Sequence, residues 1–351
     1  MRWYAFLLYP FALLYDLVTR LRNWFFDLGW LKSASSAIPS IVVGNLSVGG
    51  TGKTPMVEFL IRMLHKEYRL ATLSRGYGRK TKGFLEADPQ VSPGEIGDEP
   101  FQIYQKFGQE VFVFVGEDRV NALEKIALMS EAPELIILDD AFQHRYVKGD
   151  LNILLTTYQK PFYSDFLLPV GRLRENRAGA KRADVVIITK CPEDLGTAEM
   201  SSMKRQVASY SKANTPVLFS SISYGKPTPL ADSFSFSPRI ILLTGLANDQ
   251  PLIDYVSGNF ELVEVMSYPD HHEYSEADFD RVRTTMKQHA SQNPVVVTTE
   301  KDAVKVKSNA PKGFLEEIPI FVLAIEVNFS SADELALAQL IHQKVFKKDN
   351  I

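Results

Sequence analysis

A glycine-rich stretch, SVGGTGKTP (residues 47–55), contains the residue types that hold nucleotide phosphates. It ends like the loop G-x-x-x-x-G-K-[ST], but Ser47 stands where the first glycine is expected. In such loops backbone amides turn towards phosphate oxygens, the lysine bridges phosphates and the hydroxyl binds Mg²⁺. A structural turn with chance glycines is the alternative. We predict a nucleotide site formed by Ser47, Gly49, Gly50, Thr51, Gly52, Lys53 and Thr54.

Two adjacent aspartates, Asp139 and Asp140, follow the apolar run LIIL. In phosphate-loop enzymes a carboxylate at a strand end reaches the metal, directly or through water. A surface turn with two acids is the alternative, but the carboxyl edge of an α/β sheet is where ligands bind. The sequence predicts a metal-binding or catalytic role for this pair without deciding which aspartate contacts Mg²⁺.

Phosphorylation of an alcohol needs a base near that alcohol. Three clusters could supply it: Asp98 and Glu99 in GDEP, Gln143 and His144 in AFQHR, and Asp270, His271 and His272 in YPDHHEY. Each cluster alone could be a solvated turn. A carboxylate–histidine pair is the arrangement that would best withdraw the proton of an acceptor hydroxyl.

The segment LPVGRLRENR adds Arg172, Arg174, Glu175 and Arg177. An arginine here could neutralise charge on a transferred phosphoryl group or bind an anionic acceptor. A charged surface helix is an equally good reading of this segment in isolation. The segment TTEKDAVK (residues 298–305) also follows a strand, PVVV, but residue types alone assign it no chemistry.

The elements that must position these residues alternate between strands and helices from Ile38 onwards. Apolar strands are expected at residues 38–45, 70–78, 111–116, 135–140, 151–157 and 184–190, and later at 318–327. Such alternation predicts an α/β fold: a P-loop NTPase-like core with a mostly parallel sheet, plus a smaller α/β second domain. Serine, glycine and proline cluster in residues 220–233, so we place the core domain at 33–220 and the second domain at 221–351.

Residues 1–32 contain all three tryptophans and four basic against two acidic residues, within a chain whose net charge is -3. Phe11, Leu14, Val18, Leu21, Phe25 and Leu28 recur at the spacing of one helix face. The apolar stretch Trp3–Tyr15 is shorter than the ~20 residues that a spanning helix needs. We expect an amphipathic helix in the membrane interface. A helix packed on the protein's own core is the alternative.

The acidic net charge argues against a general nucleic-acid binder, which usually carries a basic excess. The one cysteine excludes an internal disulfide framework.

Together the segments resemble the tetraacyldisaccharide 4′-kinase family, the lipid A kinases of Gram-negative bacteria. The resemblance is carried, in the family's order, by GNLSVGGTGKTP, LSRGYGR, GDEP, DDAFQHR, LPVGRLRE, PDHH and TTEKDAVK, which span residues 44–305. The family's loop also lacks the first glycine. Ala141 departs from the family, where glycine is expected, and should affect only local turn geometry.

The resemblance implies transfer of the ATP γ-phosphate, with Mg²⁺, to the 4′-hydroxyl of a tetraacylated glucosamine disaccharide 1-phosphate. It also implies action at the cytoplasmic face of the inner membrane, and a second domain that closes over the nucleotide. We expect a monomer, although the sequence does not determine the oligomeric state. By matching motifs, Asp98 resembles the catalytic base and His271 its partner. Asp139, Asp140 and Glu175 fall where the family handles metal and phosphate, with Gln143, His144 and Arg174 beside them.

Two other classes remain open at this point. A membrane-associated P-loop switch or partitioning ATPase would share the loop but hydrolyse ATP without a lipid acceptor. A non-catalytic membrane adaptor would tolerate changes at Lys53 or Asp98.

Overall fold

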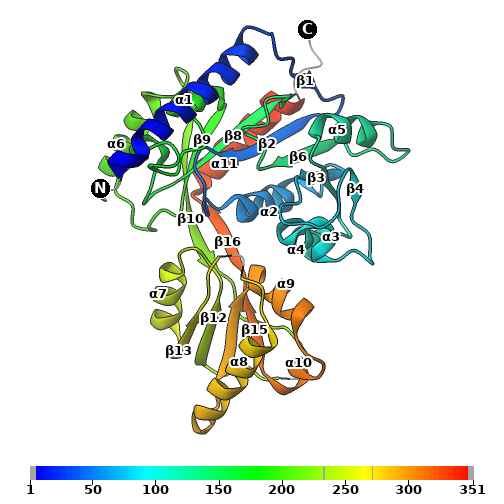
Figure 1. The fold of residues 1–351 in the computed structure, drawn as a ribbon, viewed down its shortest axis with the longest axis vertical. Coiled ribbons are helices and arrows are strands. Elements are labelled where there is room, and N and C mark those ends of the chain that lie inside the picture. Colours follow the sequence, from blue (N-terminus) through cyan, green and yellow to red (C-terminus); the bar gives the residue numbers. More distant parts are fainter. Residues whose placement is uncertain (1–4, 232–233, 271, 347–351) are drawn as a thin grey trace.

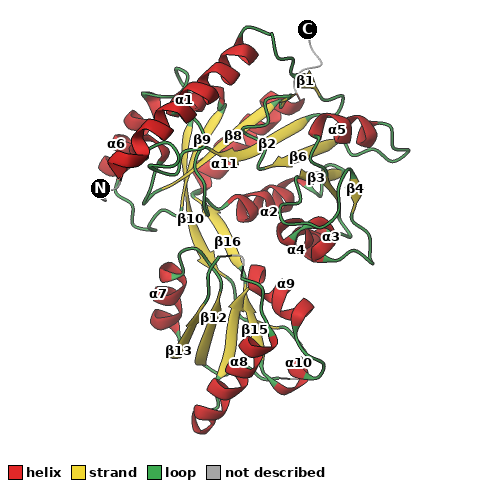
Figure 2. Cartoon of the chain, viewed as in Figure 1, coloured by secondary structure: helices red, strands yellow, loops and turns green. Residues whose placement is uncertain are grey.

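Two main sheets organise the computed structural model, which describes residues 5–231, 234–270 and 272–346 (Figure 1). Most strand pairs are parallel, and helices cover both faces of each sheet (Figure 2). This arrangement confirms the predicted α/β class, with a larger core, a smaller second α/β part and an N-terminal helix.

The larger sheet contains nine strands. Their order is β16 (Ile325–Phe329), β10 (Val217–Tyr224), β9 (Val185–Thr189), β8 (Leu151–Thr157), β2 (Ser40–Asn45), β6 (Leu135–Asp139), β3 (Leu70–Ser74), β5 (Val111–Val115) and β4 (Leu85–Glu86). The edge strands β4 and β16 run antiparallel to their neighbours. All six residues of β2 are buried, with Val42 in one core and Ile41 and Val43 in the other. Burial on both faces explains the continuous apolar runs.

Helices complete the two cores of this sheet. One face is covered by α5 (Arg119–Ala127) and α6 (Thr197–Ala208), and the other by α2 (Lys53–Leu64), α4 (Asp98–Phe107) and α11 (Ser331–Ile341). A short helix, α3 (Pro93–Ile96), precedes α4. A separate parallel pair joins β1 (Ala34–Ser35) to β7 (Val147–Lys148). The loops that contain the residues predicted to do chemistry lie at the carboxyl ends of the central strands.

The smaller sheet has five strands, in the order β11 (Thr228–Pro229), β15 (Ile320–Leu323), β14 (Val295–Thr299), β12 (Arg239–Thr244) and β13 (Glu261–Ser267). One of its cores includes residues of α8 (Glu276–Gln288), α9 (Glu300–Asn309) and α10 (Phe314–Glu317). The other includes residues of α7 (Gln250–Asn259).

The segment IPIFVLAIEV, which we expected to form one strand, divides between the two sheets. It breaks at Ala324, so that β15 ends in the smaller sheet and β16 pairs with β10 of the larger one. The chain then stays with the larger sheet, because Leu337 and Ile341 of α11 lie in the same core as α2. Residues 221–351, expected to form one domain, therefore contribute to both sheets, and β10 and β16 run between the lobes (Figure 1).

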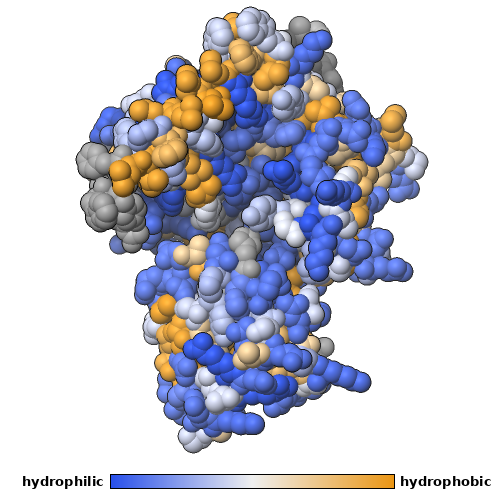
Figure 3. All heavy atoms as spheres, viewed as in Figure 1, coloured by the Kyte–Doolittle hydropathy of each residue, from blue (hydrophilic) through white to orange (hydrophobic). Residues whose placement is uncertain are grey.

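The first helix, α1 (Ala5–Asp27), keeps most of its apolar side chains exposed. The exposed ones include Leu7, Phe11, Leu13, Leu14, Leu17, Val18, Leu21 and Trp24. They lie in the hydrophobic band over α1 in Figure 3. Ala12 and Phe26 are its buried apolar residues. Among the helices of the described chain, none has the length and apolar character needed to cross a bilayer.

Candidate functional site

The phosphate-type loop joins β2 to α2 and is held by hydrogen bonds from three sides. The amide of Val48 donates to the Arg172 carbonyl at 2.7 Å, and the Asn45 amide group donates to the Thr51 hydroxyl at 2.7 Å. Thr189 Oγ1 donates to the Thr51 carbonyl at 2.8 Å. These contacts fix a loop that precedes the N-terminus of α2, where amides and the helix dipole favour an anion.

Glycine is required at two positions of this loop but not at its start. Gly49 and Gly52 have φ values of 105° and 84°, which side-chain-bearing residues rarely adopt. Ser47 has no such φ and is held by an antiparallel bridge to Leu173. The strand-like pairing at Ser47 explains why the loop forms without its first glycine.

Lys53, Asp140 and Arg174 meet at the carboxyl edge of the larger sheet. Lys53 Nζ lies 3.8 Å from Asp140 Oδ1, and Arg174 Nη1 lies 3.0 Å from both carboxylate oxygens of Asp140. Asp140 has a φ of 47°, in the left-handed region. The positive φ therefore falls on Asp140, and the turn forms with Ala141 in place of glycine. Two cations held by one carboxylate are suited to receive phosphate.

Asp139 is the most deeply buried acid of this group, with 1% of its surface exposed. Its Oδ1 has no hydrogen-bond partner within the described residues. Burial, reinforced by the nearby Glu99 carboxylate, raises the pKa of Asp139, and Lys53 opposes this rise. A buried, unpartnered carboxylate oxygen close to Lys53 fits a hard cation such as Mg²⁺.

The described residues contain no group of three histidine, cysteine, aspartate or glutamate side chains placed to enclose a metal ion. Mg²⁺ typically binds through one or two protein oxygens and takes its remaining ligands from water and phosphate. Asp139 and the hydroxyl of Thr54, in the first turn of α2, suit that pattern.

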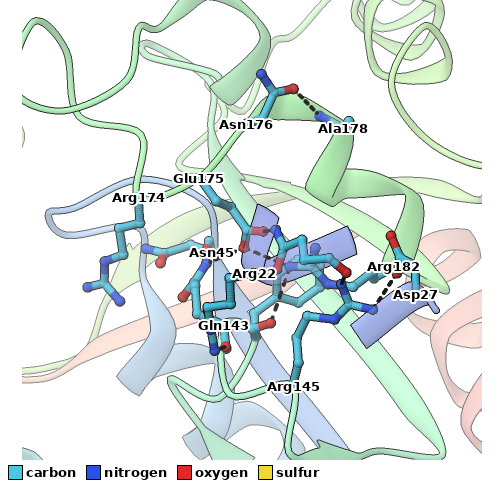
Figure 4. A network of polar contacts seen from close by, with 12 residues as sticks. Arg22, Asp27, Asn45, Gln143, Arg145, Arg174, Glu175, Asn176, Ala178 and Arg182 are labelled. Atoms are coloured by element: carbon cyan, nitrogen blue, oxygen red, sulfur yellow. Dashed lines mark hydrogen bonds and ion pairs between the residues drawn. The ribbon is translucent and has the colours of Figure 1, made fainter. Parts of the chain in front are cut away.

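Glu175 lies in a different set of contacts, shown in Figure 4. Its carboxylate accepts hydrogen bonds from Gln143 Nε2 at 3.0 Å, Arg182 Nη2 at 2.6 Å and Asn23 Nδ2 at 3.0 Å. Arg174, the preceding residue, points away from this network (Figure 4). Three donors occupy the Glu175 carboxylate, so it fixes neighbouring segments in this state, and its metal contact stays a prediction.

The same network attaches α1 to the site. Arg22 donates to the Gln143 carbonyl at 2.8 Å, and the Tyr15 hydroxyl donates to the Arg174 carbonyl at 2.7 Å. Arg145 pairs with Asp27 at 2.6 Å (Figure 4). Polar residues of α1 thus face the site residues, while its apolar residues remain exposed.

His144 has no carboxylate partner of the predicted kind. Its Nε2 is buried without a hydrogen bond in the described chain. Burial, and then the charge of Arg119, lowers the pKa of His144 to about 4. Arg22 and Arg75 also act on this ring. The charge of Asp118 opposes this shift, and burial is the main cause that keeps the His144 ring neutral.

Asp98 begins α4, directly after Gly97, whose φ is 92°. Asp98 Oδ2 lies 3.2 Å from Nζ of Lys305 in α9, so this carboxylate sits where the two lobes meet. His271, its predicted partner, lies outside the described residues. The neighbouring His272 pairs through Nε2 with Asp278 at 3.0 Å.

Three charged residues of this region were not singled out by the sequence. Arg119, at the start of α5, is buried beside Asp139, and burial lowers its pKa to about 10. Lys190 follows β9, and its Nζ lies 3.9 Å from the position that a Cβ would take on Gly50. Lys305 lies in the segment that had no assigned chemistry. All three follow parallel strands at their carboxyl ends, and that topological rule is the signal that could have identified them.

Comparisons with known proteins agree along the whole chain. A family model described as Tetraacyldisaccharide-1-P 4′-kinase matches residues 4–345. A protein named tetraacyldisaccharide 4′-kinase from Flavobacterium johnsoniae is 42% identical over 319 residues, which cover 90% of this chain and 91% of the relative. The protein of that name from Cytophaga hutchinsonii is 40% identical over 352 residues, covering 98% and 97%.

A solved structure is also similar. The crystal structure of LpxK from Aquifex aeolicus in complex with ATP has a TM-score of 0.74 to this chain at 30% sequence identity. The match covers 97% of this chain and 99% of that one.

Proposed function

Because the chain belongs to the tetraacyldisaccharide-1-P 4′-kinase family, we propose that it transfers the ATP γ-phosphate to the 4′-hydroxyl of a tetraacylated glucosamine disaccharide 1-phosphate in lipid A biosynthesis. The observation that carries this proposal is a family match over residues 4–345 that contains the loop, the aspartate pair and the arginine segment. The fold supports it, since the loop lies between a buried strand and a helix N-terminus.

The nucleotide would bind with its phosphates on the loop from Ser47 to Thr54. Backbone amides turned by Gly49 and Gly52 would hold the phosphate oxygens, and Lys53 would bridge the β- and γ-phosphates. Arg174 would neutralise charge on the transferred group, with Asp140 holding its guanidinium. Gly50 and Thr51 would contribute backbone contacts, and Gln143 and His144 would border the phosphates.

Mg²⁺ would be held by Asp139 and Thr54, with Glu175 as the remaining candidate ligand. Bound there, the ion would neutralise charge on the phosphate oxygens. The unpartnered Oδ1 of Asp139 supports this assignment for Asp139.

Lys190 would add a cation on the Gly50 side of the loop. It has a φ of 59° and no ion pair in the described part of the chain. Lys190 is an exposed residue, yet the protein around it lowers the pKa of its ammonium group by desolvation. Because this ammonium group lies beside the loop proposed to bind phosphate, the anion that we expect it to bind is the nucleotide.

Asp98, assisted by His271, would take the proton from the acceptor hydroxyl. The position of Asp98 between the lobes supports this role, because a base completed by both lobes limits ATP hydrolysis when no acceptor is present.

The acceptor carries acyl chains that stay in a bilayer, so the enzyme must reach the membrane surface. The exposed apolar residues of α1 support binding within the interface without spanning it. ATP is supplied in the cytoplasm, so the enzyme would act at the cytoplasmic face of the inner membrane. We expect it to act there as a monomer.

The test is transfer from γ-labelled ATP to a detergent-dispersed tetraacylated disaccharide 1-phosphate. The wild-type protein should label the lipid, and Asp98→Ala should label almost none while still binding ATP. Hydrolysis of ATP with no labelled lipid, unchanged by Asp98→Ala, would refute the kinase and favour the switch ATPase.

A further inference from the structure

Lys305 connects three segments that lie far apart in the sequence. Its ammonium group lies 3.2 Å from Asp98 Oδ2 and 3.7 Å from Glu273 Oε1, and it donates to the His272 carbonyl at 3.1 Å. Asp98 belongs to α4 of the larger lobe, whereas Lys305 belongs to α9 of the smaller one. The 272–273 segment follows β13, in the loop whose sequence also carries His271.

The burial of Lys305 makes these contacts specific. Its side chain is 3% exposed. A buried ammonium group is costly unless charged or polar partners surround it, and here two carboxylates and a carbonyl do so. Moving any of these partners away would reduce the compensation of the buried charge, so the lysine favours one relative position for all three.

A second lysine holds the lobes together without touching Asp98. Lys106 of α4 lies 2.6 Å from Glu58 of α2 and 2.6 Å from Glu300, which begins α9. Contact between α4 and α9 therefore does not depend on Lys305 alone. Lys305 differs from Lys106 in its partners. It contacts Asp98, the predicted base, and residues 272 and 273, which follow the predicted His271 in the sequence.

We propose that Lys305 is a positioning residue for phosphoryl transfer, which aligns the Asp98 carboxylate with residues 272 and 273 at the junction of the two lobes. The inference rests on the proposed kinase function and on Asp98 as its base. It predicts that Lys305 acts on the rate of transfer and leaves nucleotide binding unchanged, since none of the hydrogen bonds and ion pairs of Lys305 in the described residues involves the loop 47–54.

The experiment compares Lys305→Met with Lys307→Met in the labelled-lipid assay. Methionine keeps the length of the side chain without its charge, and Lys307 is an exposed lysine of the same helix. Lys305→Met should lower kcat about 100-fold, as expected when a catalytic group is misplaced. The Kd for ATP should stay within about twofold of the wild-type value, and Lys305→Arg should recover part of kcat. Lys307→Met should behave as wild type.

A double variant separates positioning from general stability. If Lys305 acts through Asp98, adding Lys305→Met to Asp98→Asn should lower kcat little further, because the group it positions is already lost. Wild-type kcat in folded Lys305→Met, or equal losses from Lys305→Met with and without Asp98→Asn, would overturn the proposal. Loss of folding in both Lys305→Met and Lys305→Gln would overturn it too, by making the lysine a stability residue.

The wild-type reaction keeps the two proposals distinct. If wild-type protein labels no lipid, the kinase function itself fails. If wild-type protein labels lipid and Lys305→Met labels it equally well, only the role of Lys305 fails.

Discussion

The charged residues predicted to bind phosphate and metal lie at the carboxyl edge of the larger sheet. Asp140 holds Arg174 and lies near Lys53, whereas the adjacent Asp139 is buried with an unpartnered oxygen. Two neighbouring acids thus have different surroundings, one organising cations and one open to a metal. Lys190 belongs to the same edge, and its left-handed φ is a local strain of the kind that surrounding structure maintains at functional sites.

Replacing Lys190 tests its proposed contact with the nucleotide. Lys190→Met should weaken ATP binding by at least about tenfold, since a charge-assisted hydrogen bond contributes about 1.5–3 kcal/mol. Turnover at saturating ATP should change little, because the contact is made in both ground and transition states. Calorimetry gives the affinity directly. Lys212→Met, at an exposed lysine, is the control. Equal ATP affinity in the two variants would exclude the contact.

Individual elements show what the sequence could and could not predict. The strands with continuous apolar runs and the loop–helix junction at Lys53 were predictable, because burial on both faces and glycine positions leave a local signature. The division of residues 318–327 was not, since both halves are apolar and only their partners in the fold differ. The surroundings of Glu175 could not be predicted either. The family motif indicates a metal ligand, but the hydrogen-bond donors around its carboxylate come from α1 and from Arg182.

The two sides of α1 differ in character, and we propose that the apolar side contacts the membrane. Asn23 and Arg22 bind site residues, and the exposed leucines are left for a membrane. The triple change Leu14→Gln, Leu17→Gln and Leu21→Gln should reduce sedimentation with anionic phospholipid vesicles at least ~10-fold, because each leucine loses apolar burial in the interface. Transfer to a detergent-dispersed acceptor should fall much less.

The control for α1 is Leu335→Gln, an exposed leucine in α11 that is not part of the band. It should leave vesicle binding unchanged. If the triple variant sediments as wild type does, the apolar side of α1 is not the membrane contact.

At the scale of the whole molecule, the two lobes are joined by the paired strands β10 and β16 and by ion pairs between α4 and α9. The chain crosses between lobes twice, so the smaller sheet is inserted between β10 and β16 of the larger one. This arrangement places Asp98 and residues 272 and 273 on opposite sides of one junction, although more than 170 residues separate them in the sequence. The sequence pattern does not predict this contact, because the contact depends on how the inserted sheet is oriented relative to the larger one.

Lys106 is the residue whose loss should loosen this junction. Lys106→Met leaves Glu58, 1% exposed, with only Arg62 and Gln102 as partners, and removes the ion pair to Glu300. The free energy of unfolding should fall by about 1–3 kcal/mol, since a buried carboxylate loses its nearest cation.

Amide hydrogen exchange should quicken in α9 and stay unchanged in α7, which covers the other face of the smaller sheet. Lys148→Met, at an exposed lysine in β7, should alter neither quantity. Wild-type exchange in α9 of Lys106→Met would mean that the pair between Lys106 and Glu300 does not stabilise the junction.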